Sequence, residues 1–367
     1  MVAFCAIPFF TVHAQAEGRQ IPPELTDGVQ IETHSKLYNA AFLEMSDMLD
    51  GKTELSVKRA EFLLEWAYLD GKLDYKEFCH AIDTTVWHIN LFIKANHLDQ
   101  YKTGGNYALF EYFSSPYSMN GRKPFTYDYE DFAGSEDLTK LFITKVMRTH
   151  SGQCRSLPVY YKVLAEAIGA EAHITLAPQH SFIRHHDEKD PNKWVNVELT
   201  TLSLSRDIVY LENFGISDEA IRNKVFMYPL SDKETVAYLL SELLVSGYLR
   251  KYNNDYDDFV WLCSQKTLEY YPQDVIALRN KGNVLTVRLM GHLKQNGNVM
   301  DDVAKWLDQA WKENNETINK LGYTEMPDDL YLKHLNDAKE EMKKAGFNTS
   351  DVETEIKQAE TKQKEKK

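Results

Sequence analysis

Three residues whose side chains could carry out acyl transfer occur in order along one stretch of the chain. Cys154 lies in the segment THSGQCRSLP, His180 in APQHSFIR and Glu198 in WVNVELT. A cysteine can serve as a nucleophile and a histidine as its base, and a carboxylate can orient the histidine. Because the three residues are far apart in sequence, they can act together only if the intervening elements bring them to one place.

The segment that follows Cys154 has the periodicity of an amphipathic helix. Apolar residues over 157–168 recur at three- and four-residue spacing, and Gly169 is suited to end the helix. Pro158 fits only a first helical turn, so the helix should begin near residues 152–155. Cys154 would then lie at the positive end of the helix dipole, where a thiolate is favoured and free backbone N–H groups can bind an oxyanion. Taken alone, this position also suits a small buried residue.

Alternating apolar residues after this helix predict three β-strands, over residues 172–176, 180–186 and 193–200. The second and third strands flank a polar loop and should form a hairpin. If the loop is centred on Lys189, His180 pairs with Glu198 across the ribbon, on the face that also carries Asn196. The alternative is a polar cross-strand pair on a solvated face.

These motifs resemble the transglutaminase-like branch of the papain-type cysteine fold. The segment GQC is similar to the nucleophile motif of that family, and WVNVELT is similar to its W-x-x-V-D-x-T strand. The phrases SLPVYYKVLAEAIG and APQHSFIR also resemble bacterial transglutaminase-like proteins that carry tetratricopeptide repeats. The resemblance implies that Cys154 is the nucleophile, His180 the general base and Glu198 the orienting acid. It also implies an α+β fold, in which the cysteine helix packs on a small antiparallel sheet.

Two positions depart from the family pattern. The usual acid is aspartate, and Glu198 is longer by one methylene group, so Asn196 is an alternative partner for His180. The aromatic residue that usually follows the cysteine is replaced by Arg155. This replacement leaves oxyanion stabilisation to backbone groups and to Gln153.

The chain on both sides of this core is predicted to be helical. Three helices are expected between residues 35 and 98, followed by an aromatic, glycine- and proline-containing stretch over 99–135 and another helix over 138–146. Further helices are expected over 235–250, 257–271 and 274–289, and the junction near Pro272 resembles a tetratricopeptide repeat. The predicted divisions are a signal peptide (1–16), an N-terminal helical region with the aromatic loop (17–134), the transglutaminase-like core (135–205), a helical, tetratricopeptide-like domain (206–350) and a disordered charged tail (351–367).

The first sixteen residues are apolar, carry no charge and end in Ala14-Gln15-Ala16. This small-x-small ending is typical of a signal-peptidase site, and the segment is too short to span a bilayer as a helix. We therefore expect an exported protein, periplasmic or secreted; the alternative is a buried N-terminal strand. Removal of this segment leaves three cysteines, of which Cys79 and Cys263 have apolar neighbours at helical spacing and are expected in the core.

Composition and charge exclude some classes of partner and site. The chain has 42 Lys and Arg against 55 Asp and Glu, a net charge of −13, which disfavours nucleic acid and anionic membranes as partners. A calcium loop around Gly71 is excluded, because Trp66 and Tyr68 would occupy ligand positions. The pair His185-His186 is expected to be solvated. No metal, no cofactor and no membrane span are predicted.

Two functions remain open at this point. The first is an exported cysteine peptidase, amidase or transamidase acting on a peptide or protein substrate. In it the Cys154 thiolate attacks an amide carbonyl, His180 protonates the leaving amine, and water or an amine resolves the thioester. The second is a catalytically silent transglutaminase-like fold that binds a protein partner together with the helical repeats.

Overall fold

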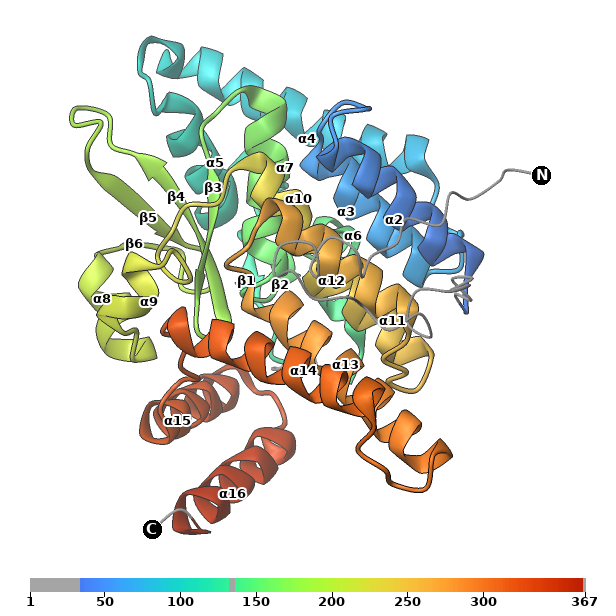
Figure 1. The fold of residues 1–367 in the computed structure, drawn as a ribbon. Helices are drawn as coiled ribbons and strands as arrows, with labels where there is room; N and C mark the ends of the chain where they lie inside the picture. Colours follow the sequence, from blue (N-terminus) through green and yellow to red (C-terminus); the bar gives the residue numbers. More distant parts are fainter. Residues whose placement is uncertain (1–33, 132–135, 366–367) are drawn as a thin grey trace.

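The computed structural model describes residues 34–131 and 136–365 of the 367-residue chain. The predicted signal peptide lies outside the described residues. The fold is mixed α and β, with helices on both sides of a small antiparallel sheet and a helical C-terminal region (Figure 1). None of the helices in these ranges combines the length and the apolar character needed to cross a bilayer.

The N-terminal region contains three successive α-helices, as predicted, and then a fourth. A serine or aspartate side chain accepts a backbone N–H bond at the start of each of the first three, which fixes where they begin. The stretch predicted as an aromatic loop instead contains the fourth helix, because Tyr112 and Phe113 are buried against the cysteine helix. The elements are α2 (Lys36–Leu49), α3 (Val57–Tyr68), α4 (Tyr75–Ala95), η2 (Leu98–Gln100), α5 (Gly104–Ser114) and η3 (Ser118–Asn120).

The helix predicted over 138–146 is broken into two pieces, the 3₁₀-helix η4 (Leu138–Leu141) and α6 (Ile143–Thr149). Phe142 between them is extended and buried. The break has a local cause: the Glu65 carboxylate accepts the N–H groups of Ile143 and Thr144, and so caps α6 from another helix.

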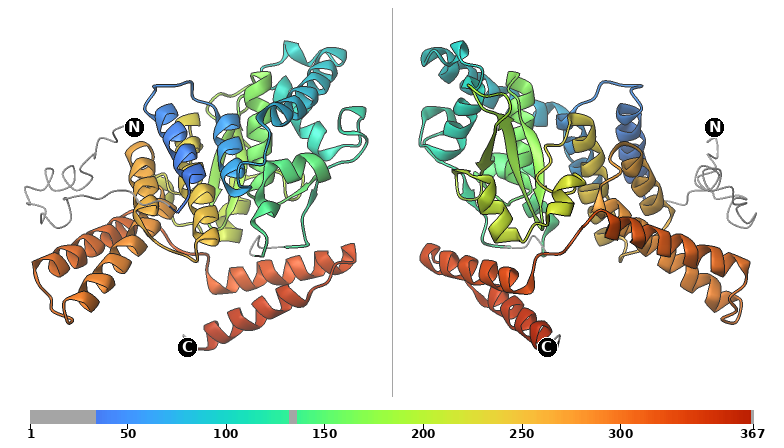
Figure 2. Two further views of the ribbon diagram at one scale, coloured as in Figure 1. Left: turned by 90° about the vertical axis from the view of Figure 1, so that its right-hand side faces the viewer. Right: turned by 60° about the vertical axis from the view of Figure 1, so that its left-hand side comes forward.

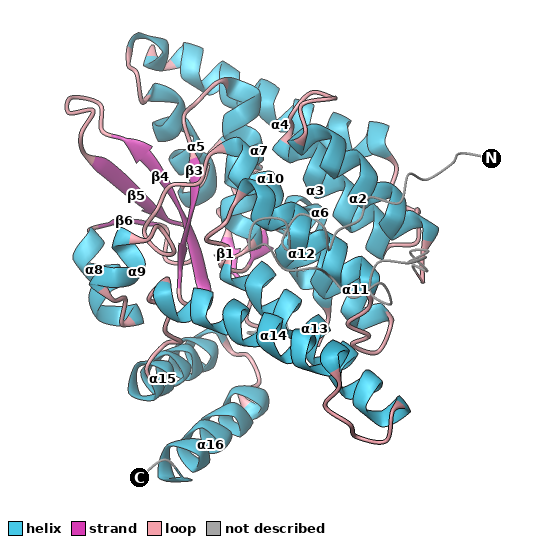
Figure 3. Cartoon of the chain, in the orientation of Figure 1, coloured by secondary structure: helices cyan, strands magenta, loops and turns pink. Residues whose placement is uncertain are grey.

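The sheet has four antiparallel strands in sequence order, preceded in the chain by the cysteine helix (Figure 3). A second, two-stranded parallel sheet, which the sequence did not predict, lies next to the start of that helix. The elements are β1 (Thr126–Tyr127), β2 (Ser151–Gly152), α7 (Ser156–Ile168), β3 (His173–Ala177), β4 (His180–His186), β5 (Trp194–Glu198) and β6 (Ser203–Ser205).

The register of the β4–β5 hairpin differs from the prediction by two residues. Ile183 lies opposite Val197, so His180 is not directly opposite Glu198. The reason lies in the loop, where the Asp187 carboxylate accepts two following backbone N–H groups and centres the turn one residue later than predicted. Because side chains alternate along a strand, the two-residue shift keeps both residues on one face.

The C-terminal half is helical and packs against the N-terminal helices. Its elements are α8 (Asp207–Phe214), α9 (Asp218–Arg222), α10 (Asp232–Leu239), the π-helical turn η5 (Leu240–Leu244), α11 (Val245–Lys251), α12 (Asp258–Tyr270), α13 (Val275–Gln295), α14 (Asp302–Lys320), α15 (Asp328–Ala345) and α16 (Ser350–Glu365). The helix predicted over 235–250 therefore contains a π-helical turn.

Two predicted divisions do not match this arrangement. One hydrophobic cluster runs from Tyr38 to Leu307, so α10 to α14 share a core with α2 and α3, whereas α8 and α9 and the last two helices contribute to two smaller clusters. The tail predicted to be disordered from residue 351 forms α16, because Val352 and Ile356, four residues apart, are buried against α15.

Candidate active site

Cys154 lies just before the first turn of α7, as the position of Pro158 predicted. The residue is half-buried, and its thiol lies 3.8 Å from the backbone carbonyl of Gln179. The Ser181 hydroxyl donates to the Cys154 carbonyl at 2.7 Å. The start of β4 therefore holds the cysteine in place from the sheet side.

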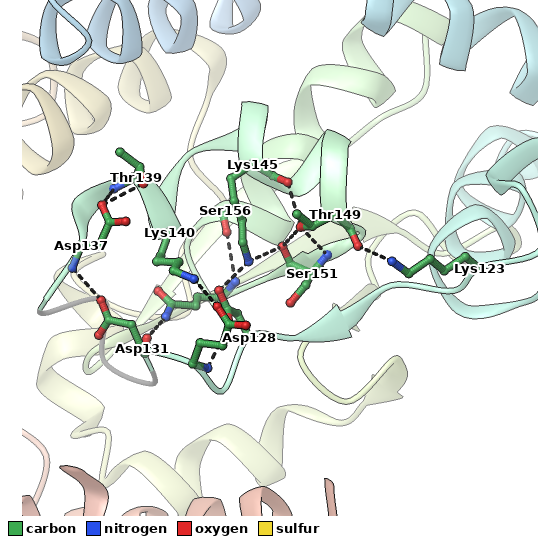
Figure 4. Close-up of polar contacts among 12 residues, drawn as sticks. Lys123, Asp128, Asp131, Asp137, Thr139, Lys140, Lys145, Thr149, Ser151 and Ser156 are labelled. Carbon is green, nitrogen blue, oxygen red and sulfur yellow. Dashed lines mark hydrogen bonds and ion pairs between the residues drawn. The ribbon is translucent and has the colours of Figure 1, made fainter. Parts of the chain in front are cut away.

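The residues before Cys154 are pinned by a buried ion pair (Figure 4). Lys145 from α6 pairs with Asp128, which follows β1, and the same ammonium group donates to the Ser151 carbonyl at 2.8 Å. The Thr149 hydroxyl donates to the Lys145 carbonyl at 2.8 Å. These contacts hold α6, β1 and β2 against one another, and β2 ends two residues before Cys154 in the chain.

His180, the first residue of β4, contacts both of its predicted partners. Its Nε2 lies 2.7 Å from Glu198 Oε2, and its ring also forms a hydrogen bond with Cys154. Since Nε2 is taken by the carboxylate, Nδ1 is the nitrogen left for the sulfur. Burial alone would lower the pKa of His180, but the Glu198 charge and the hydrogen bonds with Cys154 and Glu198 outweigh it and raise the pKa to about 10.

Glu198 ends β5 and is held by four hydrogen bonds. Its Oε1 accepts the N–H and hydroxyl of Thr200, at 3.0 and 2.7 Å, and its Oε2 accepts from His180 and from the Tyr210 hydroxyl. Burial would raise the pKa of this carboxyl, yet the His180 charge and these bonds lower it. The extra methylene of glutamate suits the diagonal position that the shifted register gives it.

Asn196, the alternative partner of His180, is engaged elsewhere. Its Oδ1 accepts from Arg184 at 2.7 Å, and its Nδ2 donates to Asp207 at 2.7 Å and to the Ser205 carbonyl at 3.0 Å. Glu198 is therefore the acidic residue that orients His180.

Tyr127 in β1 also forms part of the site and was not predicted from the sequence. Its backbone pairs with Gly152, two residues before Cys154. Burial raises the pKa of Tyr127 well above its usual range, and among the charged groups that add to the shift are Cys154, the largest of them, and Glu198. The phenol therefore stays protonated close to the thiol, where it can donate a hydrogen bond. A two-residue strand has no periodicity from which this could have been predicted.

The side chain of Gln153, predicted to stabilise an oxyanion, is used for structure. It is buried and donates to the backbone carbonyl of Asp131, while its backbone N–H donates to the Ser156 hydroxyl at 3.0 Å. The other donors near the thiol are the Tyr127 phenol and the backbone N–H of Ser156, the first residue of α7; the Leu157 N–H donates to the Gln153 carbonyl at 3.1 Å, and Pro158 has no N–H.

Arg155, which replaces the aromatic residue of the family pattern, points away from the site into the core. Its guanidinium forms two bonds to Glu61, at 2.6 and 2.8 Å, and contacts Glu242 of the π-helical turn at 3.2 Å. It also donates to the Leu141 carbonyl at 2.9 Å. We call Arg155, Glu61 and Glu242 the anchor cluster, because it joins the start of α7 to α3 and η5.

The other thiols and the histidine pair lack such surroundings. Cys263 is fully buried, and burial raises its pKa well above the usual range, whereas Cys79 is half-buried beside the Tyr75 side chain and Arg59, with no hydrogen bond from a histidine among the described residues. The prediction that His185 and His186 are solvated was wrong: His185 is buried and bonds to the His186 carbonyl, and His186 is half-buried against Glu171 and the Trp194 ring.

One group among the described residues brings three potential metal ligands within 4.8 Å of one another: His34, Asp255 and Asp257. His34 and Asp255 already form an ion pair at 2.8 Å, and Asp257 accepts a bond from Tyr248 and caps α12. These groups satisfy one another without a cation.

No protein-family model, curated protein or solved structure matches this chain. The functional argument therefore rests on the geometry of Cys154, His180 and Glu198 and on the groups that surround them.

Proposed function

We propose that this chain is a cysteine-dependent acyl-transfer enzyme of the transglutaminase-like type, acting on an amide of a peptide or protein. The observation that carries the proposal is the position of the His180 ring, hydrogen-bonded to the Cys154 thiol on one side and to the Glu198 carboxylate on the other. This order of nucleophile, base and orienting acid is what covalent acyl transfer requires.

The reaction would begin from a Cys154 thiolate paired with a His180 imidazolium. The sulfur attacks the amide carbonyl carbon and forms a C–S bond, while the carbonyl electrons move to oxygen. His180 then donates its proton to the amine nitrogen as the C–N bond breaks, leaving a thioester. Water or an acceptor amine gives a proton to His180 as it attacks the thioester, and the thiolate is released.

The negative charge on the carbonyl oxygen needs donors that are already in place. The Tyr127 phenol and the backbone N–H of Ser156, at the start of α7, are the groups we assign to this role. The assignment agrees with the burial of Gln153 in a structural contact, which removes the other donor considered.

We also propose that the protein is exported, on the basis of the apolar segment that ends in Ala14-Gln15-Ala16. This proposal places the substrate outside the cytoplasm. N-terminal sequencing of the protein after expression in a secreting host tests it: cleavage after Ala16 supports export, and an intact Met1 contradicts it.

The catalytic proposal is tested with an activated ester, because the natural substrate is unidentified. Treatment with p-nitrophenyl acetate should give an acetyl adduct on Cys154 that hydroxylamine removes, located by peptide mapping. Cys154→Ser should abolish the adduct, and Cys79→Ser should not change it. An adduct spread equally over the three cysteines would contradict the proposal.

A second candidate function is a non-catalytic interaction protein. Its support is the group of exposed apolar residues near the outer end of the α13–α14 pair, which projects from the rest of the molecule (Figure 2): Val287, Met290, Val299 and Met300. This reading predicts no thioester, and so the acetylation experiment separates the two functions.

A further inference from the structure

The last two helices form a pair that is set apart from the body of the protein. Figures 1 and 2 show α15 beside α8, below the lower end of the sheet, with α16 packed against α15; a single length of chain joins the pair to α14. The pair has a small apolar cluster of its own, made of Leu335, Met342, Val352 and Ile356. What this pair touches on the body determines what it can do.

His334, in the first half of α15, contacts a ring that packs on His180. The Phe214 ring, at the end of α8, stacks on His180 with ring centroids 4.9 Å apart, and on its other side it contacts the His334 ring at 5.0 Å. His334 and Lys333 also form hydrogen bonds with Asn213, at 2.8 and 3.1 Å. A single phenylalanine ring therefore separates α15 from His180.

The C-terminal end of α15 contacts a residue next to Tyr127. The Tyr129 ring lies 5.1 Å from the Tyr127 ring, and it also lies 5.9 Å from the ring of Phe347, which follows α15. Tyr129 is packed against the apolar cluster of the pair. A single tyrosine ring therefore separates this end from Tyr127, the residue beside Cys154.

These two contacts place α15 beside Phe214, the neighbour of His180, and its end beside Tyr129, the neighbour of Tyr127. From His334 to Ala345, the last residue of α15, the helix makes about three turns and rises about 16 Å, and Phe347 follows two residues later. His334 reaches the side of the site that carries His180, and Phe347 reaches the side that carries Tyr127.

We propose that the α15–α16 pair is a cover over the Cys154 site, which opens to admit a polypeptide. The proposal rests on the proposed acyl-transfer function and adds to it a selection by size. A small molecule reaches the thiol with the cover closed, whereas a polypeptide chain needs the cover displaced.

The contacts between the α15–α16 pair and the rest of the protein would allow the two helices to move together. At its base, Pro327 packs tightly on Gly215, where an added Cβ would lie 2.6 Å from the proline ring. Beyond this point the pair is held mainly by ring contacts and a few hydrogen bonds, while its own cluster keeps the two helices together. Elements with few buried contacts are those that open at low free energy.

The test compares how fast two thiol reagents of different size modify Cys154. Iodoacetamide should react readily, and a maleimide carrying a long polyethylene glycol chain should react slowly in the unaltered protein. Phe347→Ala and His334→Ala each remove one ring contact and should raise the rate with the large reagent by roughly three- to tenfold, with little change for iodoacetamide. Trp311→Ala is the matched control, because Trp311 on α14 is 39% exposed, as Phe347 is.

Two outcomes would overturn the cover. For each cysteine, the rate with the large reagent is divided by the rate with the small one. The first contradicting outcome is the same ratio at Cys154 and at Cys79 in the unaltered protein. The second is a ratio that neither Phe347→Ala nor His334→Ala changes. Failure of the enzyme proposal gives a different result, in which iodoacetamide modifies Cys154 no faster than Cys79.

Hydrogen exchange gives a second measurement that does not depend on these variants. With the large adduct attached to Cys154, amides of α15 should exchange faster than they do with the small carbamidomethyl adduct. Equal exchange of α15 in the two adducts would contradict a cover that must be displaced.

Discussion

Cys154 and Arg155 are neighbours at the start of one helix, yet their surroundings differ completely. The Cys154 thiol is half-buried, forms a hydrogen bond with the His180 ring and lies 3.8 Å from the Gln179 carbonyl oxygen. The Arg155 guanidinium is buried and bonded to two glutamates and a backbone carbonyl. The comparison shows a division of roles. Arg155 fixes the start of the helix, and this leaves the Cys154 sulfur half-exposed beside His180.

The carboxylates of the two regions also differ. At the site, Glu198 is paired with a protonated histidine, and its pKa is lowered in spite of burial. Around the anchor cluster, one arginine serves several buried acids, and burial raises the pKa of Glu242 and that of Glu65 on the neighbouring helical turn. The pKa of Glu198 is thus lowered by its contact with His180, whereas burial keeps the pKa of Glu65 high.

The largest effect that separates the regions is expected from His180→Ala. Loss of the base should slow acetylation of Cys154 by about 10²- to 10⁴-fold, the usual contribution of general acid–base catalysis. The urea midpoint should change less than it does for Arg155→Met, because Glu198 keeps its bonds to Thr200 and Tyr210. Acetylation rates and urea unfolding of the same samples check both parts.

Arg155→Met should have the opposite effect to His180→Ala: a large loss of stability and a smaller change in the acetylation rate of the folded protein. Removing the guanidinium leaves Glu61 and Glu242 buried without their partner, and breaking a buried pair in this way typically costs about 3–5 kcal/mol. Urea denaturation measures the loss. Lys162→Met is the control for a buried cation whose acidic partner, Asp232, is half exposed and can be solvated; equal losses in the two variants would contradict the role of the anchor cluster.

Glu198→Gln should shift the pH dependence of acetylation. The Glu198 charge is the main cause that raises the pKa of His180 to about 10, and without it the pKa should fall toward the ordinary 6.5. The limb of the pH profile where His180 loses its proton should therefore move to lower pH by one or more units. Asn196→Ser, which alters the same strand face but not the His180 contact, should leave that limb in place; a shift in both variants would count against a direct role of Glu198.

The smallest effect is expected from Glu65→Gln, on the pH dependence of stability. Burial and the Glu61 charge raise the pKa of Glu65 from 4.5 to about 8, so the folded chain holds a proton that the unfolded chain releases. Stability from this group is fully present below pH 4.5 and is lost as pH rises through about 8. Glutamine cannot ionise, and so urea unfolding of this variant should depend less on pH between 5 and 8; an unchanged slope would contradict this assignment.

The elements predicted correctly from the sequence are those in which apolar residues recur at regular spacing. The helix after Cys154 and the strand that begins at His180 were predicted closely, because apolar spacing and Pro158 determine them locally. The hairpin register was wrong by two residues, because the Asp187 carboxylate folds the loop in a way that strand alternation does not reveal. The error did not separate His180 from Glu198, since both stayed on one face.

Contacts between distant segments could not be predicted from local pattern. Tyr127 reaches the site from a two-residue strand, and the partners of Arg155 come from α3, η4 and the π-helical turn. The charged composition after residue 351 concealed α16, whose Val352 and Ile356 acquire a partner only when α15 is beside them. In each case tertiary packing decided the outcome.

The central claim is that His180 activates Cys154, and competitive alkylation of the three cysteines tests it most directly. With limiting iodoacetamide at neutral pH, the folded protein should be modified at Cys154 at least about tenfold faster than at Cys79 or Cys263, and His180→Ala should remove most of this difference. Equal and slow modification of all three thiols, or a fast Cys154 that is unaffected by His180→Ala, would contradict the account.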